Sequence, residues 1–118
     1  MNVKQFYQET NSNYESALTL LMNDAFIERM VKKFMENNSY NALIEAYKAN
    51  DIKQVFNYAH ALKGVAGNLS LTKLFEASCE LTEATRDKES ANIDKEIEKL
   101  KSAYELIEEK YKSLVHLN

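Results

Sequence analysis

Hydrophobic residues recur along most of this chain with the spacing of amphipathic helices. The clearest pattern begins at Ile93, from which apolar residues recur at alternating intervals of four and three positions as far as Leu114. This is the spacing of the apolar seam of a helical bundle, and lysine, glutamate and serine fill the positions between. The chain is therefore expected to end in a long helix that packs against others. The seam residues are Ile93, Ile97, Leu100, Tyr104, Ile107, Tyr111 and Leu114.

Three shorter stretches nearer the N-terminus have the same helical character. Residues 14–22 form a short one, and residues 25–35 carry a wide apolar band of phenylalanine, isoleucine, valine and methionine. Residues 40–48 continue that band after a polar run at positions 37–39. The pattern leaves open whether the last two stretches form one interrupted helix or two separate helices.

The stretch from Asp51 to Leu69 is predicted to be a helix. Asp51 has Gln54 three positions later, which is the pattern of an N-terminal cap. On a helical wheel the apolar residues gather on one side, which is the side expected to face the core. The residues on that side are Val55, Tyr58, Leu62, Val65, Ala66 and Leu69.

A further helix is expected through "LTKLFEASCELTEATR", with either Ser70 or Thr72 as its N-cap. Four substantial amphipathic helices with short connections predict an all-α fold. We expect an up-and-down antiparallel four-helix bundle with a short additional N-terminal helix. A length of 118 residues is typical of one domain, so residues 1–118 are expected to form a single domain whose bundle core spans about residues 24–116.

The composition supports a helical protein of the cytoplasm. Two glycines and no proline leave few residues that favour the tight turns of β-rich folds. The net charge of −3 argues against nucleic acid as the main partner, because phosphate backbones bind clustered lysine and arginine. The single cysteine, Cys79, cannot form an internal disulfide. No signal peptide and no membrane span are visible, so we expect a cytoplasmic location and no membrane partner.

Both glycines, Gly64 and Gly67, lie within one predicted helix and on the face opposite its apolar side. A glycine inside a helix costs about 1 kcal/mol relative to alanine, so two on an exposed face need a reason. His60 lies on the same face, one turn before Gly64. With no side chain at Gly64 and a small one at Ala61, a large partner can approach the imidazole closely. Lys63 places an ammonium group within reach of anything attached to His60, which suits the transient holding of a phosphoryl group.

Two more residues of this face are candidates for contact with a partner. Phe56 lies one turn before His60, and an exposed aromatic ring is a typical docking anchor; Asn57 lies beside it. A rotation of the helix by about 40° would instead tuck Phe56 into the core. Gly67, followed by Asn68, is equally typical of a helix C-terminus, so the access role is one of two explanations for it.

The stretch "AHALKGVAGNLSLTKLFEASCEL" resembles the signature of the histidine phosphotransfer (HPt) family. The core of that signature, His-x-Leu-Lys-Gly, is met by His60, Leu62, Lys63 and Gly64. The resemblance covers roughly residues 14–115. It implies a phosphorelay in two-component signal transduction, in which a phosphoryl group passes from an aspartyl phosphate on a receiver domain to His60 and on to another receiver's aspartate.

The resemblance also implies the partners. They would be response-regulator receiver domains and a hybrid sensor histidine kinase. Mg²⁺ would be held by the receiver, so the chain itself is expected to need no cofactor and no metal. It would be a phosphocarrier without autonomous catalysis, not an enzyme, and the sequence contains no P-loop or kinase motif set. The starting methionine favours a free-standing carrier over a piece of a larger kinase.

Two positions depart from the family's pattern. The family usually has glycine ten residues after the histidine, where this chain has Ser70. It often has glutamate or glutamine twenty-two residues after the histidine, able to hydrogen-bond the imidazole, where this chain has Thr82. The orientation of the imidazole is therefore less well defined by the sequence, and Glu83 or a water could substitute.

Plainer interpretations of the same residues stay open. His60 could be an ordinary surface histidine, and Lys63 a solvated charge. A non-phosphorylated helical adaptor would bind a partner through an apolar groove that includes Phe56, and it predicts that His60→Gln leaves binding and signalling intact. A metal- or haem-binding bundle needs a second inward ligand, and His60 faces outward without one.

Overall fold

The structure, a computed structural model, describes the backbone of residues 1–116 and the side chains of residues 1–114. Within that range all regular structure is α-helical, which confirms the all-α prediction. Leu117 and Asn118, the last residues of the expected domain, lie outside the described residues, as does the side chain of His116. The helices are α1 (Val3–Glu9), α2 (Tyr14–Leu21), α3 (Asp24–Glu36), α4 (Ser39–Lys48), α5 (Ile52–Asn68), α6 (Thr72–Thr85) and α7 (Asp94–His116).

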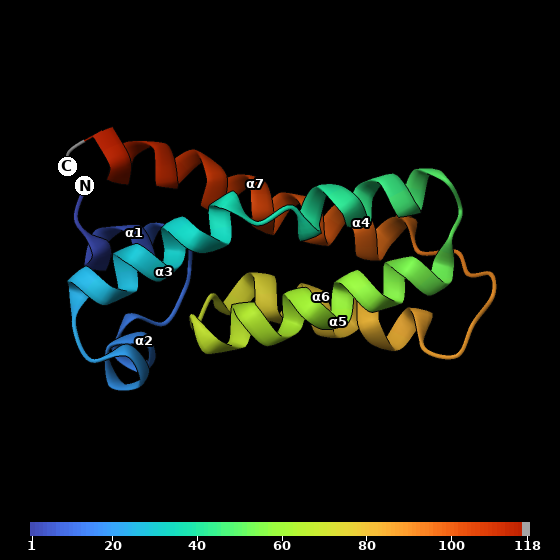
Figure 1. Ribbon diagram of the computed structural model, residues 1–118, viewed down its shortest axis with the longest axis horizontal. Coiled ribbons are helices and arrows are strands. Elements are labelled where there is room, and N and C mark those ends of the chain that lie inside the picture. The colour runs from blue at the N-terminus through green and yellow to red at the C-terminus, as the bar shows by residue number, and fades with distance from the viewer. Residues whose placement is uncertain (117–118) are drawn as a thin grey trace.

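The long helices lie side by side along an elongated molecule (Figure 1). α3 and α4 follow one another in the same direction, α5 returns, α6 reverses beside α5, and α7 runs back along the length of the molecule. The described part of the chain has seven helices instead of the expected four with one short addition. The difference arises because two short helices, α1 and α2, come first, and because α3 and α4 together take the place of one long bundle helix.

The break between α3 and α4 decides the alternative that the sequence left open. Asn37 has an extended backbone, with φ −74° and ψ 139°, and so ends α3. Its side-chain Oδ1 accepts a hydrogen bond from the backbone N–H of Ser39 at 2.7 Å, at the start of α4. Asparagine breaks helices in this way because its short side chain competes for backbone hydrogen bonds.

α1 is a helix that the hydrophobic pattern does not predict. Its start carries a capping box, in which the Gln5 N–H donates to Asn2 Oδ1 at 2.8 Å and the Asn2 N–H donates to Gln5 Oε1 at 3.0 Å. Phe6 and Tyr7 are fully buried, and the Tyr7 hydroxyl donates to the Leu69 carbonyl at 2.6 Å. α1 therefore closes one end of the bundle and satisfies a carbonyl at the end of α5.

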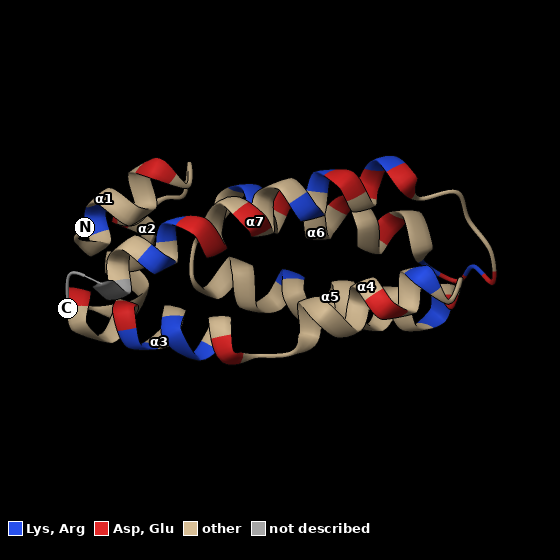
Figure 2. Cartoon of the chain, turned by 90° about the horizontal axis from the view of Figure 1, so that it is seen from above, with Lys and Arg blue, Asp and Glu red and all other residues tan. Residues whose placement is uncertain are grey.

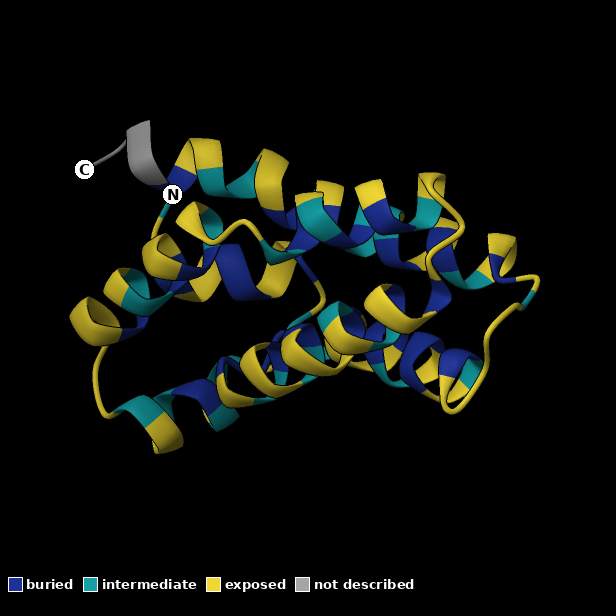
Figure 3. Ribbon diagram, turned by 45° about the vertical axis from the view of Figure 1, so that its right-hand side comes forward, coloured by how far each residue is buried: buried dark blue, intermediate teal, exposed yellow. Residues whose placement is uncertain are grey.

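The apolar seam predicted for the last helix faces the core, as expected. Six of its seven residues are buried, and Tyr111 is half-buried. Tyr104 stacks on Tyr40 with ring centres 3.7 Å apart, and it meets the edge of Phe34 at 6.0 Å, so aromatic rings join α7 to α3 and α4. Figure 3 shows buried residues on the inward sides of the helices and exposed residues on their outward sides.

The turn between α5 and α6 is closed by backbone hydrogen bonds. The Leu71 N–H donates to the Ala66 carbonyl at 2.9 Å and the Ser70 N–H donates to the Gly67 carbonyl at 3.2 Å, which is a Schellman motif. Ser70 has φ 55°, a left-handed conformation that glycine adopts without strain, so this is a position where glycine is favoured. Leu71 is the N-cap of α6, and no cap hydrogen bond comes from a side chain. The prediction that Ser70 or Thr72 caps α6 is therefore wrong, because Ser70 is used to end α5.

α2 supports this turn from outside. The Asn13 N–H donates to the Ser70 carbonyl at 3.0 Å, and the Ser70 Oγ donates to the Ser16 Oγ at 2.8 Å. A non-glycine residue in the left-handed region costs about 1 kcal/mol, and these two contacts offset that cost. They also fix α2 beside the end of α5.

Candidate functional site

α5 is the helix that carries the candidate residues. Its start is capped as predicted, because Asp51 Oδ1 accepts the Gln54 N–H at 3.2 Å. The helix has 17 residues, and one side of it is buried in the bundle, which leaves the opposite side for solvent. The buried residues are Ile52, Val55, Ala59, Leu62 and Ala66.

The structure brings the residues singled out in the sequence to the outward side of α5. His60 is exposed near the middle of the helix, and Asn57, Ala61 and Gly64 are exposed around it. Phe56, Lys63 and Gly67 are half-buried and lie on the side of α5 nearest α6. We call this surface the His60 face; it is formed by Phe56, Asn57, His60, Ala61, Lys63, Gly64 and Gly67.

Val65 does not belong to the core side, contrary to the prediction. It is 37% exposed, whereas Ala59 is fully buried. The buried arc of α5 is centred nearer to Ala59 than the wheel indicates, because α6 covers that flank of the helix and α3 leaves the Val65 flank partly open.

The two glycines have different surroundings. A Cβ atom added at Gly64 would meet no atom within 4 Å, so this position is open space. A Cβ atom added at Gly67 would lie 3.2 Å and 3.3 Å from two ring carbons of Phe75 in α6. Such contacts are tighter than ordinary van der Waals distances, so the ring would have to shift. The absent side chain therefore leaves open space at Gly64 and room for the Phe75 ring at Gly67.

The imidazole of His60 stacks on the ring of Phe56. The two ring centres are 6.0 Å apart and the ring planes differ by 13°. The residues are four positions apart, so their side chains are neighbours on the helix surface. Phe56 is half-buried, and its ring is directed toward His60 and α6 rather than tucked into the core.

Arg86 is a neighbour of the site that sequence reasoning misses. Its guanidinium carbon lies 5.3 Å from the centre of the Phe56 ring, which is a cation–π contact. Glu83 holds the same guanidinium: Arg86 Nη2 donates to Oε1 at 2.9 Å, and Nε donates to Oε2 at 3.4 Å. No periodic signal connects Phe56 with Arg86, because they lie in different elements, 30 positions apart.

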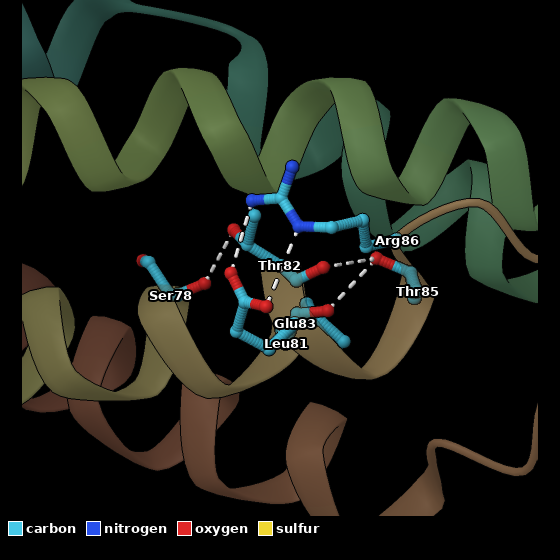
Figure 4. Close-up of polar contacts among 6 residues, drawn as sticks. All are labelled: Ser78, Leu81, Thr82, Glu83, Thr85 and Arg86. Atoms are coloured by element: carbon cyan, nitrogen blue, oxygen red, sulfur yellow. Dashed lines mark hydrogen bonds and ion pairs between the residues drawn. The ribbon is translucent and has the colours of Figure 1, made fainter.

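Thr82 does not reach the imidazole. Figure 4 shows its hydroxyl turned along α6, where Oγ1 donates to the Ser78 carbonyl at 2.7 Å, and Thr82 is fully buried. In the same view the carboxylate of Glu83 is bound to Arg86, which extends toward α5. Glu83 therefore binds Arg86 and does not supply the hydrogen bond to His60 that Thr82 lacks.

The charges around the His60 face are of both signs: Lys53 pairs with Glu89 at 3.8 Å, and Arg86 pairs with Glu83 at 2.9 Å. The only charged residues of α5 are Lys53 and Lys63, and α5 is mostly uncharged in Figure 2. The hydrogen bond from Arg86 lowers the pKa of the Glu83 carboxyl below its ordinary value of 4.5, and nearby Lys63 adds a smaller lowering. Lys63 therefore lies close enough to α6 to act on a negative charge there. A dianionic group attached to His60 would lie on the same helix as the ammonium group of Lys63, three positions away.

An apolar groove lies beside the His60 face, between α2, α3 and the end of α5. Its volume is about 460 Å³, and Val65 and Asn68 of α5 form part of its wall. Leu20 at its rim is 58% exposed. We call it the α2–α3 groove; its other apolar lining residues include Leu21, Phe26, Met30 and Phe34.

Two further properties concern the described residues as a whole. Among residues 1–114 no group of three or more histidine, cysteine, aspartate or glutamate side chains is arranged to hold a metal ion. None of the helices in the described part combines the length and the apolar character that crossing a membrane requires.

Comparison with known proteins gives one clear result. A family model described as Hpt domain matches residues 4–110, which is nearly the whole chain. No curated protein and no solved structure gives a significant match. The matched range includes α1, which lies upstream of the segment whose sequence shows the resemblance.

Proposed function

Because the chain belongs to the Hpt domain family, we propose that it is a phosphorelay intermediate of two-component signal transduction with His60 as its phosphoryl acceptor. Histidine phosphotransfer is the function of this family, and its members work with receiver domains. The finer proposal is that His60 accepts the group from a receiver's aspartyl phosphate and passes it to the aspartate of another receiver.

The reaction needs one nucleophile from this chain. A lone pair on a ring nitrogen of neutral His60 attacks the phosphorus of the aspartyl phosphate. The N–P bond forms while the bond from phosphorus to the aspartate oxygen breaks, so the receiver regains a free carboxylate. The same step in reverse at a second receiver restores the imidazole. Catalysis consists of in-line positioning and neutralisation of charge, to which Lys63 contributes its ammonium group.

The observation that carries the proposal is the open surface beside the imidazole. His60 is exposed, and the space next to it at Gly64 is free of atoms within 4 Å of a Cβ position. A receiver buries its aspartate in a pocket, so the acceptor must enter that pocket with little around it. Asn57 and Ala61, both exposed and small, leave the approach clear on the flank away from α6.

The remaining parts of the proposal concern partners and setting. We propose that the chain is a single domain that acts in the cytoplasm, with a hybrid sensor histidine kinase and response-regulator receivers as partners. The divalent cation of the reaction belongs to the receiver, and the chain supplies no cofactor. It is a carrier without turnover of its own.

The test is transfer from a receiver domain that has been phosphorylated beforehand, in the presence of Mg²⁺. We expect acid-labile, base-stable phosphate on the wild-type chain and on the His116→Gln control, and none on His60→Gln. Phosphate that persists on the His60→Gln protein would contradict the assignment of His60.

A second candidate function, a non-phosphorylated helical adaptor, is favoured by the α2–α3 groove, although Phe56 is not among its lining residues, contrary to the prediction from the sequence. An apolar groove of this kind can hold the apolar face of a partner helix. The adaptor predicts that Leu20→Asp abolishes partner binding and that His60→Gln leaves signalling intact. The carrier predicts that His60→Gln abolishes signalling while partner binding survives.

A further inference from the structure

On the premise that His60 is the phosphoryl acceptor, which is the proposed function, we propose that Phe56 is a positioning residue for the imidazole. Its ring holds the imidazole of His60 in one orientation, and Arg86 holds the ring of Phe56. The three side chains form a series of contacts from α6 to the acceptor on α5. We call Phe56 and Arg86 the positioning pair.

The first contact in this series is the stack of Phe56 on His60. The ring planes differ by 13° and the ring centres are 6.0 Å apart, which is the geometry of an offset stack. Among the residues whose side chains are described, the imidazole of His60 contacts the aromatic ring of Phe56 and makes no hydrogen bond. A stack restricts rotation of the imidazole, yet it leaves both ring nitrogens free, because their lone pairs and protons lie in the ring plane.

The second contact fixes Phe56 itself. The phenyl ring is only half-buried, so a contact with a second side chain further limits its rotamers. The guanidinium of Arg86 lies 5.3 Å from its centre, and Glu83 holds that guanidinium with two hydrogen bonds at the end of α6. Arg86 follows the last residue of α6, so its backbone position is set by the helix. This series of contacts thus connects the acceptor to a second helix of the bundle.

The two side chains of α6 that were candidates for orienting the imidazole are engaged elsewhere. The Thr82 hydroxyl is buried and bound to the Ser78 carbonyl, and the Glu83 carboxylate is bound to Arg86. Orientation by stacking therefore replaces orientation by a hydrogen bond from α6. This role differs from that of a docking anchor, because a docking anchor acts on the receiver whereas the positioning pair acts on His60.

The kinetic test separates the two roles by measuring transfer from a phosphorylated receiver at varied receiver concentration. Phe56→Leu keeps an apolar side chain but removes the ring. At saturating receiver we expect the first-order rate constant of transfer to fall by about tenfold or more, because small errors of position cost that much in rate. The receiver concentration that gives half of the limiting rate should stay within about twofold of wild type. Phe56→Tyr keeps the ring and should restore the limiting rate constant, and Arg86→Gln should lower it by a smaller factor.

A matched control exists on α3. Arg29 lies over the ring of Phe26 at 5.6 Å, which is the same type of contact away from His60. Arg29→Gln should leave the limiting rate constant of transfer unchanged. If Phe56→Leu instead raises the half-saturating receiver concentration and leaves the limiting rate constant at the wild-type value, Phe56 is a docking anchor and the positioning proposal is wrong, while the proposed function stands.

A spectroscopic measurement tests the positioning without any phosphate. In proton NMR, the phenyl ring should shift the ring protons of His60 from the positions they have without it and give cross-relaxation between the two rings. Both signatures should be lost in Phe56→Leu, weakened in Arg86→Gln and unchanged in Arg29→Gln, with His60→Gln used to assign the signals. Identical His60 signals in the wild type and Phe56→Leu would overturn the proposal. This readout holds even if the chain takes up no phosphate, in which case only the proposed function fails.

Discussion

The outward faces of α5 and α7 belong to helices of one bundle, and they carry different residues. On α7 lysine and glutamate occupy most exposed positions, and Lys99 forms an ion pair with Glu80 of α6 at 2.8 Å. On α5 the exposed positions include His60 and Gly64, and the helix has no acidic residue. Mixed charges are typical of a surface that keeps a helix stable and soluble. The face of α5 gives up about 1 kcal/mol of helix stability at Gly64 and leaves open space beside the exposed imidazole of His60.

The inward faces of the same two helices are alike. Leu62 on α5 and Ile107 on α7 are both 1% exposed and belong to one core cluster. α5 therefore resembles α7 on its inner side and differs from it on its outer side.

Removing core volume should damage both helices equally. Leu62→Ala and Ile107→Ala should each lower the free energy of unfolding by about 2–5 kcal/mol, because each leaves a cavity in a packed interior. Urea unfolding measures this. A loss below about 1 kcal/mol for either variant would show that the inward faces are not equivalent.

Ser78→Ala should stabilise the bundle without changing the His60 face. The Ser78 Oγ is buried and has no hydrogen-bond partner among the described residues, and alanine is the better helix former. We expect a gain of about 1 kcal/mol in the free energy of unfolding. The phosphoryl-transfer rate should stay at the wild-type value, and a change in that rate would show that α6 affects the acceptor through its core side.

The two glycines should respond differently to alanine. Gly64→Ala should raise the free energy of unfolding by up to about 1 kcal/mol, because the new methyl group meets nothing. Gly67→Ala should gain less, because the methyl group would lie 3.2 Å from the ring of Phe75. In a Phe75→Leu background the two gains should converge. Equal gains in the wild-type background would mean that Gly67 is as open as Gly64.

Acidic pH should loosen the contact that holds Arg86. The pKa of Glu83 lies below its ordinary value because Arg86 hydrogen-bonds the carboxylate. A carboxyl whose pKa is lower in the folded than in the unfolded state stabilises the fold above the unfolded pKa, and this contribution is lost as pH falls through the folded pKa. Between about pH 5 and about pH 3 the melting temperature of Glu83→Gln should therefore fall slightly less than that of the wild type. Parallel curves would mean that the ion pair contributes nothing.

Much of the fold follows from local sequence features. The period of the seam from Ile93 to Leu114 defines the buried side of α7, and the Asp51 and Gln54 pair predicts the start of α5. The same wheel turns His60 toward solvent, where the structure has it. Even α1 had a readable signal in Asn2 and Gln5, although its few apolar residues give no periodic pattern.

What the sequence could not predict depends on contacts between helices. Val65 is half open because α2 and α3 leave a groove beside it, and the wheel of α5 contains no information on those helices. The Phe75 ring against Gly67 and the Arg86 guanidinium over Phe56 depend on how α6 is rotated against α5. Helix periodicity specifies which side of a helix is buried, but it does not specify which neighbour each flank meets.

The most direct test of the central claim, that the open space on α5 serves phosphoryl transfer, is the rate of transfer to Gly64→Gln. Glutamine is a better helix former than glycine, so the variant should be at least as stable as the wild type. Its long side chain would fill the space beside His60, and transfer from a phosphorylated receiver should fall by about tenfold or more. A stable Gly64→Gln protein that accepts phosphate at the wild-type rate would contradict the account.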